Sequence, residues 1–190
     1  MGDRDRAWAL LTEYTESPSL RNHALAVEAA MRAYARRCGE DQEKWGVVGL
    51  LHDFDYERWP GPDQHPVRGA EILRQQGYPE DVVNAVLSHA PYTGVPRDTA
   101  MARALFAVDE LAGFLIAVAL VRPSRSLLDV KVSSVRKKLK QPSFAAAVSR
   151  QDIEAGARAL GVELDEHLAT VIEALQGVAD RIGLAGGDAH

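Results

Sequence analysis

Histidine and carboxylate side chains recur in this sequence where the surrounding residues are apolar. Four of them fall on or at the ends of predicted helices: His23, His52, His89 and Asp109. Ionisable groups are costly to bury unless they are paired or bound to metal. A single such histidine is more often an ordinary core residue, but imidazole and carboxylate together suit Mn, Fe, Co, Ni or Zn. The combination therefore indicates a site for a divalent transition metal.

Two consecutive helices are predicted to position the first part of this site. Apolar residues recur with the helical period from Leu20 to Tyr34, and His23 lies on this apolar face. A short apolar helix from Trp45 to Leu51 then leads directly into His52 and Asp53. An adjacent His-Asp pair at a helix end can direct both side chains into one cavity.

Two more histidines lie at the ends of a predicted helix pair. Pro66 fits the first turn of a helix that runs to Gln76, with His65 at its start. A second helix opens at Pro79 and leads to His89. Because the connection between the two helices is short, we expect them to pack antiparallel. This arrangement would bring His65 and His89 to the same side of the molecule.

A long central helix is predicted from Thr99 to Val121. Asp109 and Glu110 interrupt its apolar surface near the middle, and Pro123 stops it. The helices that carry His23 and Asp109 can close the metal cavity from other sides. Spacing alone does not establish that they do.

The whole chain is predicted to be all-α, because no segment alternates between apolar and polar residues over a convincing length. We expect one domain at residues 1–184, with the metal-site core at about 20–125 and C-terminal helices at about 126–184. The C-terminal part should contain a basic helix near 129–140, a short helix after Pro142, and helices around 151–160 and 165–182. Residues 185–190 are expected to form a disordered tail.

The order of the candidate ligands resembles that of a known family. His23, then LLHD with His52 and Asp53, then VDEL with Asp109, resembles the H…HD…D signature of HD-domain metal-dependent phosphohydrolases. The resemblance to this superfamily covers about residues 20–125. The run from GLLHDFDYE through AVDELAGFLIAVALVRPSRS to VRKKLKQPSFAAAV also resembles small stand-alone bacterial HD proteins. This resemblance implies an HD-type helical bundle.

Two further segments resemble the binuclear members of that superfamily. HPVRGAEIL begins with His65, and SHA contains His89, where binuclear members have two extra histidines. In such members the aspartate of the HD pair bridges two metals. The resemblance thus implies one or two ions per chain, with Mn, Fe, Co, Ni and Zn as candidates. The implied ligands are His23, His52, Asp53 and Asp109 for one ion and Asp53, His65 and His89 for the other.

The resemblance also implies an activity, which is hydrolysis of a phosphate ester by a metal-activated hydroxide. The expected substrate is a nucleotide or another small phosphorylated metabolite. We assign catalytic roles to Asp53, Asp55 and Glu57, since the last two follow the HD pair closely enough to orient water, support a ligand or protonate the leaving group. Arg122 and Lys131 are candidate phosphate-binding residues, although the basic cluster around them is equally typical of a solvated helix face.

Two other functions are compatible with the same residues. The ligand pattern is similar to that of mixed-valent di-iron oxygenases of the superfamily, and sequence does not separate iron redox chemistry from hydrolysis. A non-catalytic sensor or scaffold with a structural metal is the second alternative. The apparently complete ligand set makes that role less favoured.

Composition narrows the class of partner. The net charge of −5 argues against broad binding to nucleic acid, which usually depends on a basic face.

The single cysteine, Cys38, excludes an internal disulfide framework and favours a reducing compartment, so we expect a cytoplasmic protein. The N-terminus lacks the apolar core of a signal peptide, and the apolar stretch Ala112 to Val121 is too short to cross a bilayer, so no membrane association is expected. A homo-oligomer is compatible with the sequence.

Overall fold

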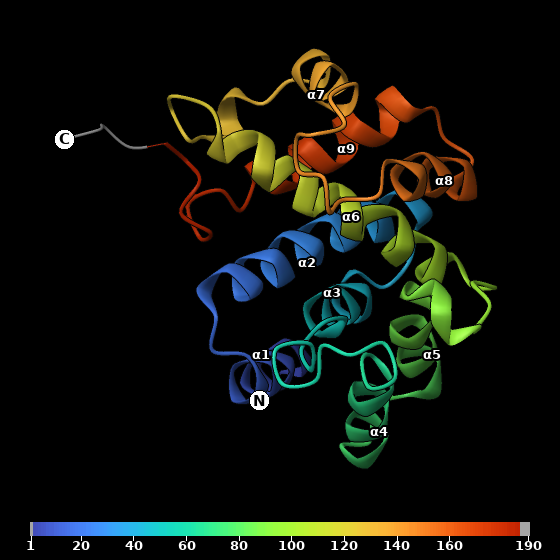
Figure 1. Cartoon of the computed structure of the whole chain (residues 1–190). Coiled ribbons are helices and arrows are strands. Elements are labelled where there is room, and N and C mark those ends of the chain that lie inside the picture. Colours follow the sequence, from blue (N-terminus) through green and yellow to red (C-terminus); the bar gives the residue numbers. More distant parts are fainter. Residues whose placement is uncertain (1, 187–190) are drawn as a thin grey trace.

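The computed structural model of this chain, shown in Figure 1, describes residues 2–186. Between these residues it contains helices, turns and an isolated β-bridge but no β-strand, so the predicted all-α class is confirmed. The helices are α1 (Asp3–Tyr14), α2 (Pro18–Cys38), α3 (Gln42–Leu51), α4 (Val67–Gln75), α5 (Glu80–His89), α6 (Ala100–Leu120), α7 (Val132–Leu139), α8 (Arg150–Leu160) and α9 (Leu164–Gln176), with short 3-10 helices at Pro91–Thr93 and Leu127–Asp129.

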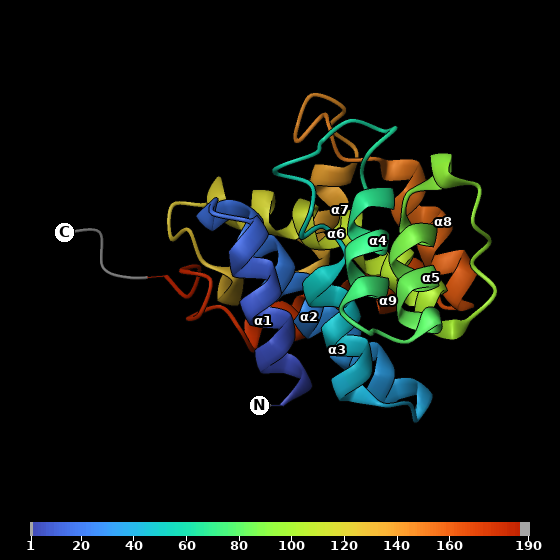
Figure 2. The same cartoon turned by 90° about the horizontal axis from the view of Figure 1, so that it is seen from below.

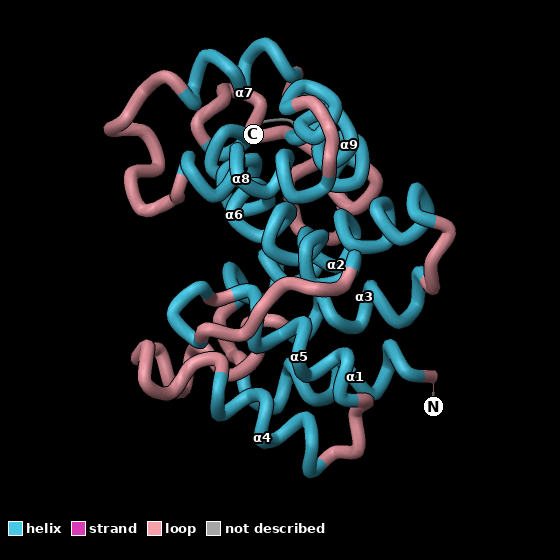
Figure 3. Tube along the Cα trace, turned by 90° about the vertical axis from the view of Figure 1, so that its right-hand side faces the viewer, coloured by secondary structure: helices cyan, strands magenta, loops and turns pink. Residues whose placement is uncertain are grey.

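The helices are arranged around a central pair. Helices α2 and α6 pack against each other in the middle of the molecule (Figure 1). Figure 3 shows α1, α3, α4 and α5 on one side of α2, and α7, α8 and α9 on the other side. Within the first group, α4 and α5 lie side by side (Figure 2).

Helix α6 is apolar almost all round because other helices cover it on several sides. It packs against α2, α5, α8 and α9, and Phe114 and Leu115 near its middle are fully buried. Its first turn is capped by Thr99, whose side chain accepts a hydrogen bond from the backbone N–H of Ala102 at 3.1 Å. A helix buried in this way provides a rigid support for Asp109.

Helix α3 approaches α2 very closely, as the glycines of its sequence predict. A Cβ atom on Gly49 would lie 2.9 Å from the backbone nitrogen of Glu28 and 2.9 Å from the carbonyl oxygen of Val27. Only glycine permits this approach of the two backbones. The contact fixes the end of α3, and therefore His52 and Asp53, beside the helix that carries His23.

The C-terminal part differs from the sequence prediction at two points. The short helix expected after Pro142 is absent, and residues 142–148 form turns instead. The Arg150 guanidinium donates to the carbonyl oxygens of Ala145 at 2.6 Å and Val148 at 2.7 Å, so these groups are satisfied without a helix. Helix α9 also ends at Gln176, earlier than predicted, and turns follow it.

The end of the described chain is held against the helices. Ala185 forms an isolated antiparallel bridge with Ser126, whose hydroxyl also donates to the Ala185 carbonyl oxygen at 2.9 Å. Ala185 is therefore not part of a disordered tail, contrary to our expectation for 185–190. Residues 187–190 of that predicted tail lie outside the described residues.

None of the helices within residues 2–186 combines the length and the apolar character that a membrane crossing requires.

Candidate metal centre

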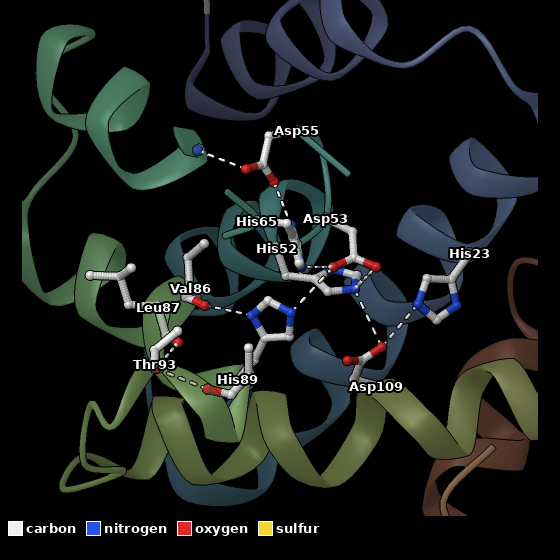
Figure 4. Close-up of polar contacts among 12 residues, drawn as sticks. His23, His52, Asp53, Asp55, His65, Val86, Leu87, His89, Thr93 and Asp109 are labelled. Carbon is white, nitrogen blue, oxygen red and sulfur yellow. Dashed lines mark hydrogen bonds and ion pairs between the residues drawn. The ribbon is translucent and has the colours of Figure 1, made fainter. Parts of the chain in front are cut away.

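Six side chains from five segments of the chain meet in one region beside α6 (Figure 4). They are His23 from α2, His52 and Asp53 at the end of α3, His65 just before α4, His89 at the end of α5, and Asp109 from α6. These are the six residues that the sequence singled out as ligands. They form two groups that could each hold a metal ion, and Asp53 belongs to both.

The first group contains two histidines and two aspartates. The Asp109 Oδ1 atom lies 2.9 Å from His23 Nε2 and 3.3 Å from His52 Nε2. His52 Nε2 is also 3.4 Å from Asp53 Oδ2. One small space between four side chains is thus bordered by two imidazole nitrogens and two carboxylates.

The second group is built on the other oxygen of Asp53. Its Oδ1 atom lies 3.2 Å from His65 Nε2 and 3.2 Å from His89 Nε2. The two imidazole rings are close neighbours, with centroids 5.2 Å apart. Asp53 therefore presents one oxygen to each group, which is the geometry that a bridging carboxylate needs.

Hydrogen bonds on the outer side of three rings fix their orientation. His52 Nδ1 donates to the carbonyl oxygen of Gly49 at 2.7 Å, and His89 Nδ1 donates to that of Val86 at 2.5 Å. His65 Nδ1 lies 2.8 Å from a carboxylate oxygen of Asp55. In a neutral ring these contacts place the proton on Nδ1 and leave the Nε2 lone pair facing inward.

The inward-facing nitrogens indicate what the centre can hold. His52 is fully buried, and its Nε2 atom has no hydrogen-bond partner among residues 2–186. A lone pair that faces a carboxylate oxygen requires a cation between them, which is either a proton or a metal ion. Nitrogen and oxygen ligands in this proportion fit a divalent transition metal.

Without metal, protons must lie between the imidazole nitrogens and the carboxylate oxygens. The shifted pKa values of His65 and Asp53 agree with this. Burial would lower the pKa of His65, but its hydrogen bonds with Asp53 and Asp55 outweigh burial and raise that pKa to about 9. Burial would likewise raise the pKa of Asp53, yet His52 and the hydrogen bonds of His65 and His89 hold it well below its usual value. Metal binding must therefore displace a proton from His65.

Asp55 lies behind one of the ligand histidines. It is fully buried behind His65, and its second oxygen accepts a hydrogen bond from the backbone N–H of Gly69 at 2.8 Å. A Cβ atom on Gly69 would lie 2.9 Å from the carboxyl carbon of Asp55, so glycine is needed there. Of the roles considered from sequence, this geometry supports the one in which Asp55 supports a ligand histidine.

Glu57 faces away from the centre. Its Oε2 atom accepts hydrogen bonds from the backbone N–H groups of Glu16 at 2.6 Å and Ser17 at 3.1 Å, where α2 begins. Glu57 is not among the residues that line the pocket over the metal centre. The catalytic role suggested for it is replaced by a structural one.

Arg122 and Lys131 are also displaced from the site. Arg122 lies just after α6, whose last residue, Leu120, is about 16 Å along the helix axis from Asp109. Lys131 is exposed at the start of α7. Because neither residue lines the pocket, the structure does not support the predicted phosphate contacts.

A pocket of about 380 Å³ opens over the metal centre. Besides five of the six ligand residues, it is lined by Tyr56, Ala90, Pro91, Tyr92, Phe106, Glu110, Gly113, Val148 and Asp152. Sequence reasoning did not assign the aromatic residues or Asp152 to the site. The only signal available was that Tyr56 and Tyr92 occupy the two loops that leave the metal-binding segments.

A second hollow, of about 420 Å³, lies elsewhere on the molecule. Its lining comes from α2 and α9 and includes Arg32, Arg36 and Arg37 but none of the six candidate ligands. The pocket with the metal-ligand side chains is therefore the relevant site, although it is not the larger of the two.

Comparison with known proteins agrees with this geometry. Residues 20–113 match the family model of the HD domain. This chain is an HD-domain protein. HD domains bind divalent metals, and their superfamily consists typically of metal-dependent phosphohydrolases, so the predicted family is confirmed.

The relatives found for this HD-domain protein include two named ribonuclease Y. That of Nitratidesulfovibrio vulgaris is 33% identical over 101 residues, covering 51% of this chain and 18% of the relative. That of Oleidesulfovibrio alaskensis is 30% identical over 103 residues, with the same coverage of 51% and 18%. The match thus spans less than a fifth of each relative's length. No solved structure gave a significant match.

Proposed function

We propose that this HD-domain protein hydrolyses the phosphate ester of a small metabolite at a centre of two divalent ions. The observation that carries the proposal is the position of Asp53, whose two oxygens face two separate groups of histidine nitrogens. His23, His52, Asp53 and Asp109 would hold one ion, and Asp53, His65 and His89 the other.

The residues of this chain would have distinct tasks in such a reaction. Divalent ions at this position would acidify water and polarise a phosphoryl oxygen. Asp53 would set the separation of the two binding groups, because it contributes one oxygen to each. Asp55, Gly49 and Val86 keep Nε2 of three histidines directed inward, which a precise ligand shell requires. The reaction needs no nucleophile from a protein side chain.

The size and charge of the pocket favour a small substrate over a polynucleotide. The relatives named ribonuclease Y make RNA the main alternative substrate. However, a volume of about 380 Å³ suits a small ligand. The pocket-lining residues within 2–186 also include no lysine or arginine, and the chain carries a net charge of −5. These features oppose the extended phosphate contacts that RNA binding uses.

The experiment is a hydrolysis screen of metal-loaded protein. Chelator-treated protein would be loaded in turn with Mn, Fe, Co, Ni or Zn and assayed with phosphate monoesters, nucleotides, dinucleotides and a short RNA. We expect turnover of a small ester that depends on added metal and is lost in Asp53→Ala. The matched control is Asp63→Ala, which removes an exposed acid from the loop after the HD pair. A protein that hydrolyses none of these compounds with any metal, or an Asp53→Ala variant with normal turnover, would overturn the proposal.

A further inference from the structure

The pocket over the metal centre has an unusual composition for a site that should accept a phosphate. Its lining outside the ligand set includes three aromatic residues, Tyr56, Tyr92 and Phe106, and two acids, Glu110 and Asp152. Among the described lining residues there is no lysine or arginine to face the substrate. Any positive charge for the phosphate must therefore come from the metal centre at the base of the pocket.

The two additional acids change the charge balance at the mouth of the pocket. At the base, Asp53 and Asp109 offset only part of the charge of two divalent ions, and the remainder can be neutralised by one phosphate monoester. Glu110 and Asp152 then face no lysine or arginine among the described residues that line the pocket. A second phosphate group on the substrate would be repelled there, whereas a positively charged group would be attracted.

Both acids belong to a wall that the C-terminal helices hold in place. Glu110 follows Asp109 on α6, and its Oε2 atom accepts a hydrogen bond from the backbone N–H of Ser149 at 3.0 Å. Ser149 caps α8 by accepting a hydrogen bond from the N–H of Asp152 at 3.2 Å. Asp152 lies outside residues 20–113, the part that matches the HD family model. The part of this wall that Asp152 supplies is thus outside the matched segment, whereas Glu110 lies within it.

The opposite wall presents aromatic rings to the same space. Tyr56 and Tyr92 are 40% and 55% exposed, which is high for aromatic residues that line a pocket. Both are anchored to His65: the Tyr56 ring packs edge-on against the imidazole, with centroids 5.2 Å apart, and the Tyr92 hydroxyl donates to the His65 carbonyl oxygen at 3.1 Å. Aromatic faces attract cations, and quaternary ammonium groups are the best-known cationic ligands of this kind.

Phe106 already has a cationic neighbour. The guanidinium carbon of Arg97 lies 3.7 Å from the centre of the Phe106 ring, while Arg97 Nε donates to the carbonyl oxygen of Ser88 at 2.8 Å. Arg97 does not itself line the pocket, so it offsets the two acids only in part. The contact shows that a cation is accommodated on an aromatic ring of the pocket lining.

From these observations we propose that the substrate is a phosphate monoester whose alcohol portion carries an amine or quaternary ammonium group. Tyr56, Tyr92, Asp152 and Glu110 would bind the cationic group, while the phosphate faces the metal centre. Hydrolysis would add one water to the ester and release the amino alcohol and inorganic phosphate. This inference rests on the proposed phosphohydrolase function and assigns its substrate class.

The test compares two esters of nearly equal shape that differ in charge. Phosphocholine carries a quaternary nitrogen, and 3,3-dimethylbutyl phosphate has a carbon atom in its place. We expect kcat/KM of the metal-loaded protein to be at least about tenfold higher for phosphocholine. In Asp152→Asn, and separately in Tyr92→Leu, this ratio should fall toward one. Since both esters are assayed on one preparation, partial misfolding of a variant does not change the ratio.

The matched control is Glu154→Gln, which removes an acid from the same helix at an exposed position. This variant should keep the ratio of the parent protein. A second readout needs no turnover: phosphonate analogues of the two esters, with CH₂ in place of the bridging oxygen, would be titrated calorimetrically into metal-loaded protein. The cationic analogue should bind about tenfold more tightly.

The outcomes separate the two proposals. Equal hydrolysis of both esters, or a preference that Asp152→Asn and Tyr92→Leu leave unchanged, would overturn the substrate class and leave the phosphohydrolase function intact. If the cationic phosphonate binds preferentially but neither ester nor any compound of the wider screen is hydrolysed, the cation-binding wall stands and the phosphohydrolase function fails. If neither analogue is preferred and nothing is hydrolysed, both are wrong.

Discussion

The carboxylate of Asp55 lies 2.8 Å from Nδ1 of His65, on the side of the ring that faces away from Asp53. His65 is thus held between two aspartates, one of which borders the metal centre while the other is fully buried behind it. Such an outer carboxylate fixes the orientation of a ligand histidine and increases its basicity. Asp55 is therefore a positioning residue rather than a group that contacts substrate.

Replacing Asp55 by Asn should weaken metal binding without removing any ligand. The carboxylate accepts hydrogen bonds from both His65 and Gly69, and an amide can accept with only one of its two heavy atoms. We expect the affinity for the ion held by Asp53, His65 and His89 to fall about 10- to 100-fold, measured by competition with a chromophoric chelator. Asp63→Asn is the matched control. An Asp55→Asn protein with parental affinity for every bound ion would refute the positioning role.

The metal-free protein should lose stability as the pH rises through about 9. The pKa of His65 is about 9 in the folded protein, above its ordinary value of 6.5. Protonation of His65 therefore stabilises the fold fully below pH 6.5, and this stabilisation is lost as the pH rises through about 9. The shift corresponds to at most about 3 kcal/mol.

Thermal unfolding of chelator-treated protein at pH 6.5 and pH 9.5 measures this effect. The difference between the parent and His65→Gln isolates the contribution of His65, and that difference should be larger at the lower pH. Metal loading should remove most of this pH dependence, because the ion then takes the place of the proton on His65. An equal difference at both pH values would contradict the assigned protonation state.

Glu57→Ala is expected to affect stability but not catalysis. The side chain accepts two backbone hydrogen bonds where α2 begins, so its loss should lower the free energy of unfolding by about 1 kcal/mol. The values of kcat and KM should remain those of the parent, since the carboxylate lies outside the pocket. Denaturant titration and steady-state kinetics on the same preparation would check both parts. A large loss of kcat with unchanged stability would show that Glu57 takes part in catalysis.

The oxygenase alternative leads to a distinct observation. If the centre performs hydrolysis, iron-loaded protein should release phosphate from its substrate without consuming oxygen, under air or under nitrogen. An oxygen electrode and a phosphate assay on the same reaction would measure both. Oxygen uptake that is stoichiometric with product would favour the di-iron oxygenase instead.

The sequence predicted the metal centre better than its surroundings. The ligand residues were recognisable because His and Asp occur at apolar helical positions in an order that resembles a family signature. Spacing could not choose among the roles considered for Asp55, since its burial depends on how the loop after His52 turns back toward Gly69. That turn is a tertiary feature with no local pattern of its own.

The errors in the predicted substrate contacts have a similar origin. Arg122 is near Asp109 in sequence, but α6 continues from Asp109 to Leu120, about 16 Å along its axis, before Arg122 is reached. Asp152 is distant in sequence and reaches the pocket because α8 packs against α6. The turns at 142–148 were predicted as a helix because the carbonyl contacts of Arg150 are not visible in the sequence.

The most direct test of the account is the number of metal ions per chain, measured by elemental analysis of protein purified without chelator. If Asp53 joins two binding groups, the parent protein should contain about two ions per chain. His65→Ala and His89→Ala should each retain about one ion, and Asp53→Ala should retain almost none. A firm stoichiometry of one ion that is unchanged by His65→Ala and His89→Ala would contradict the two-ion centre, and a parent protein that binds no divalent metal would contradict the account as a whole.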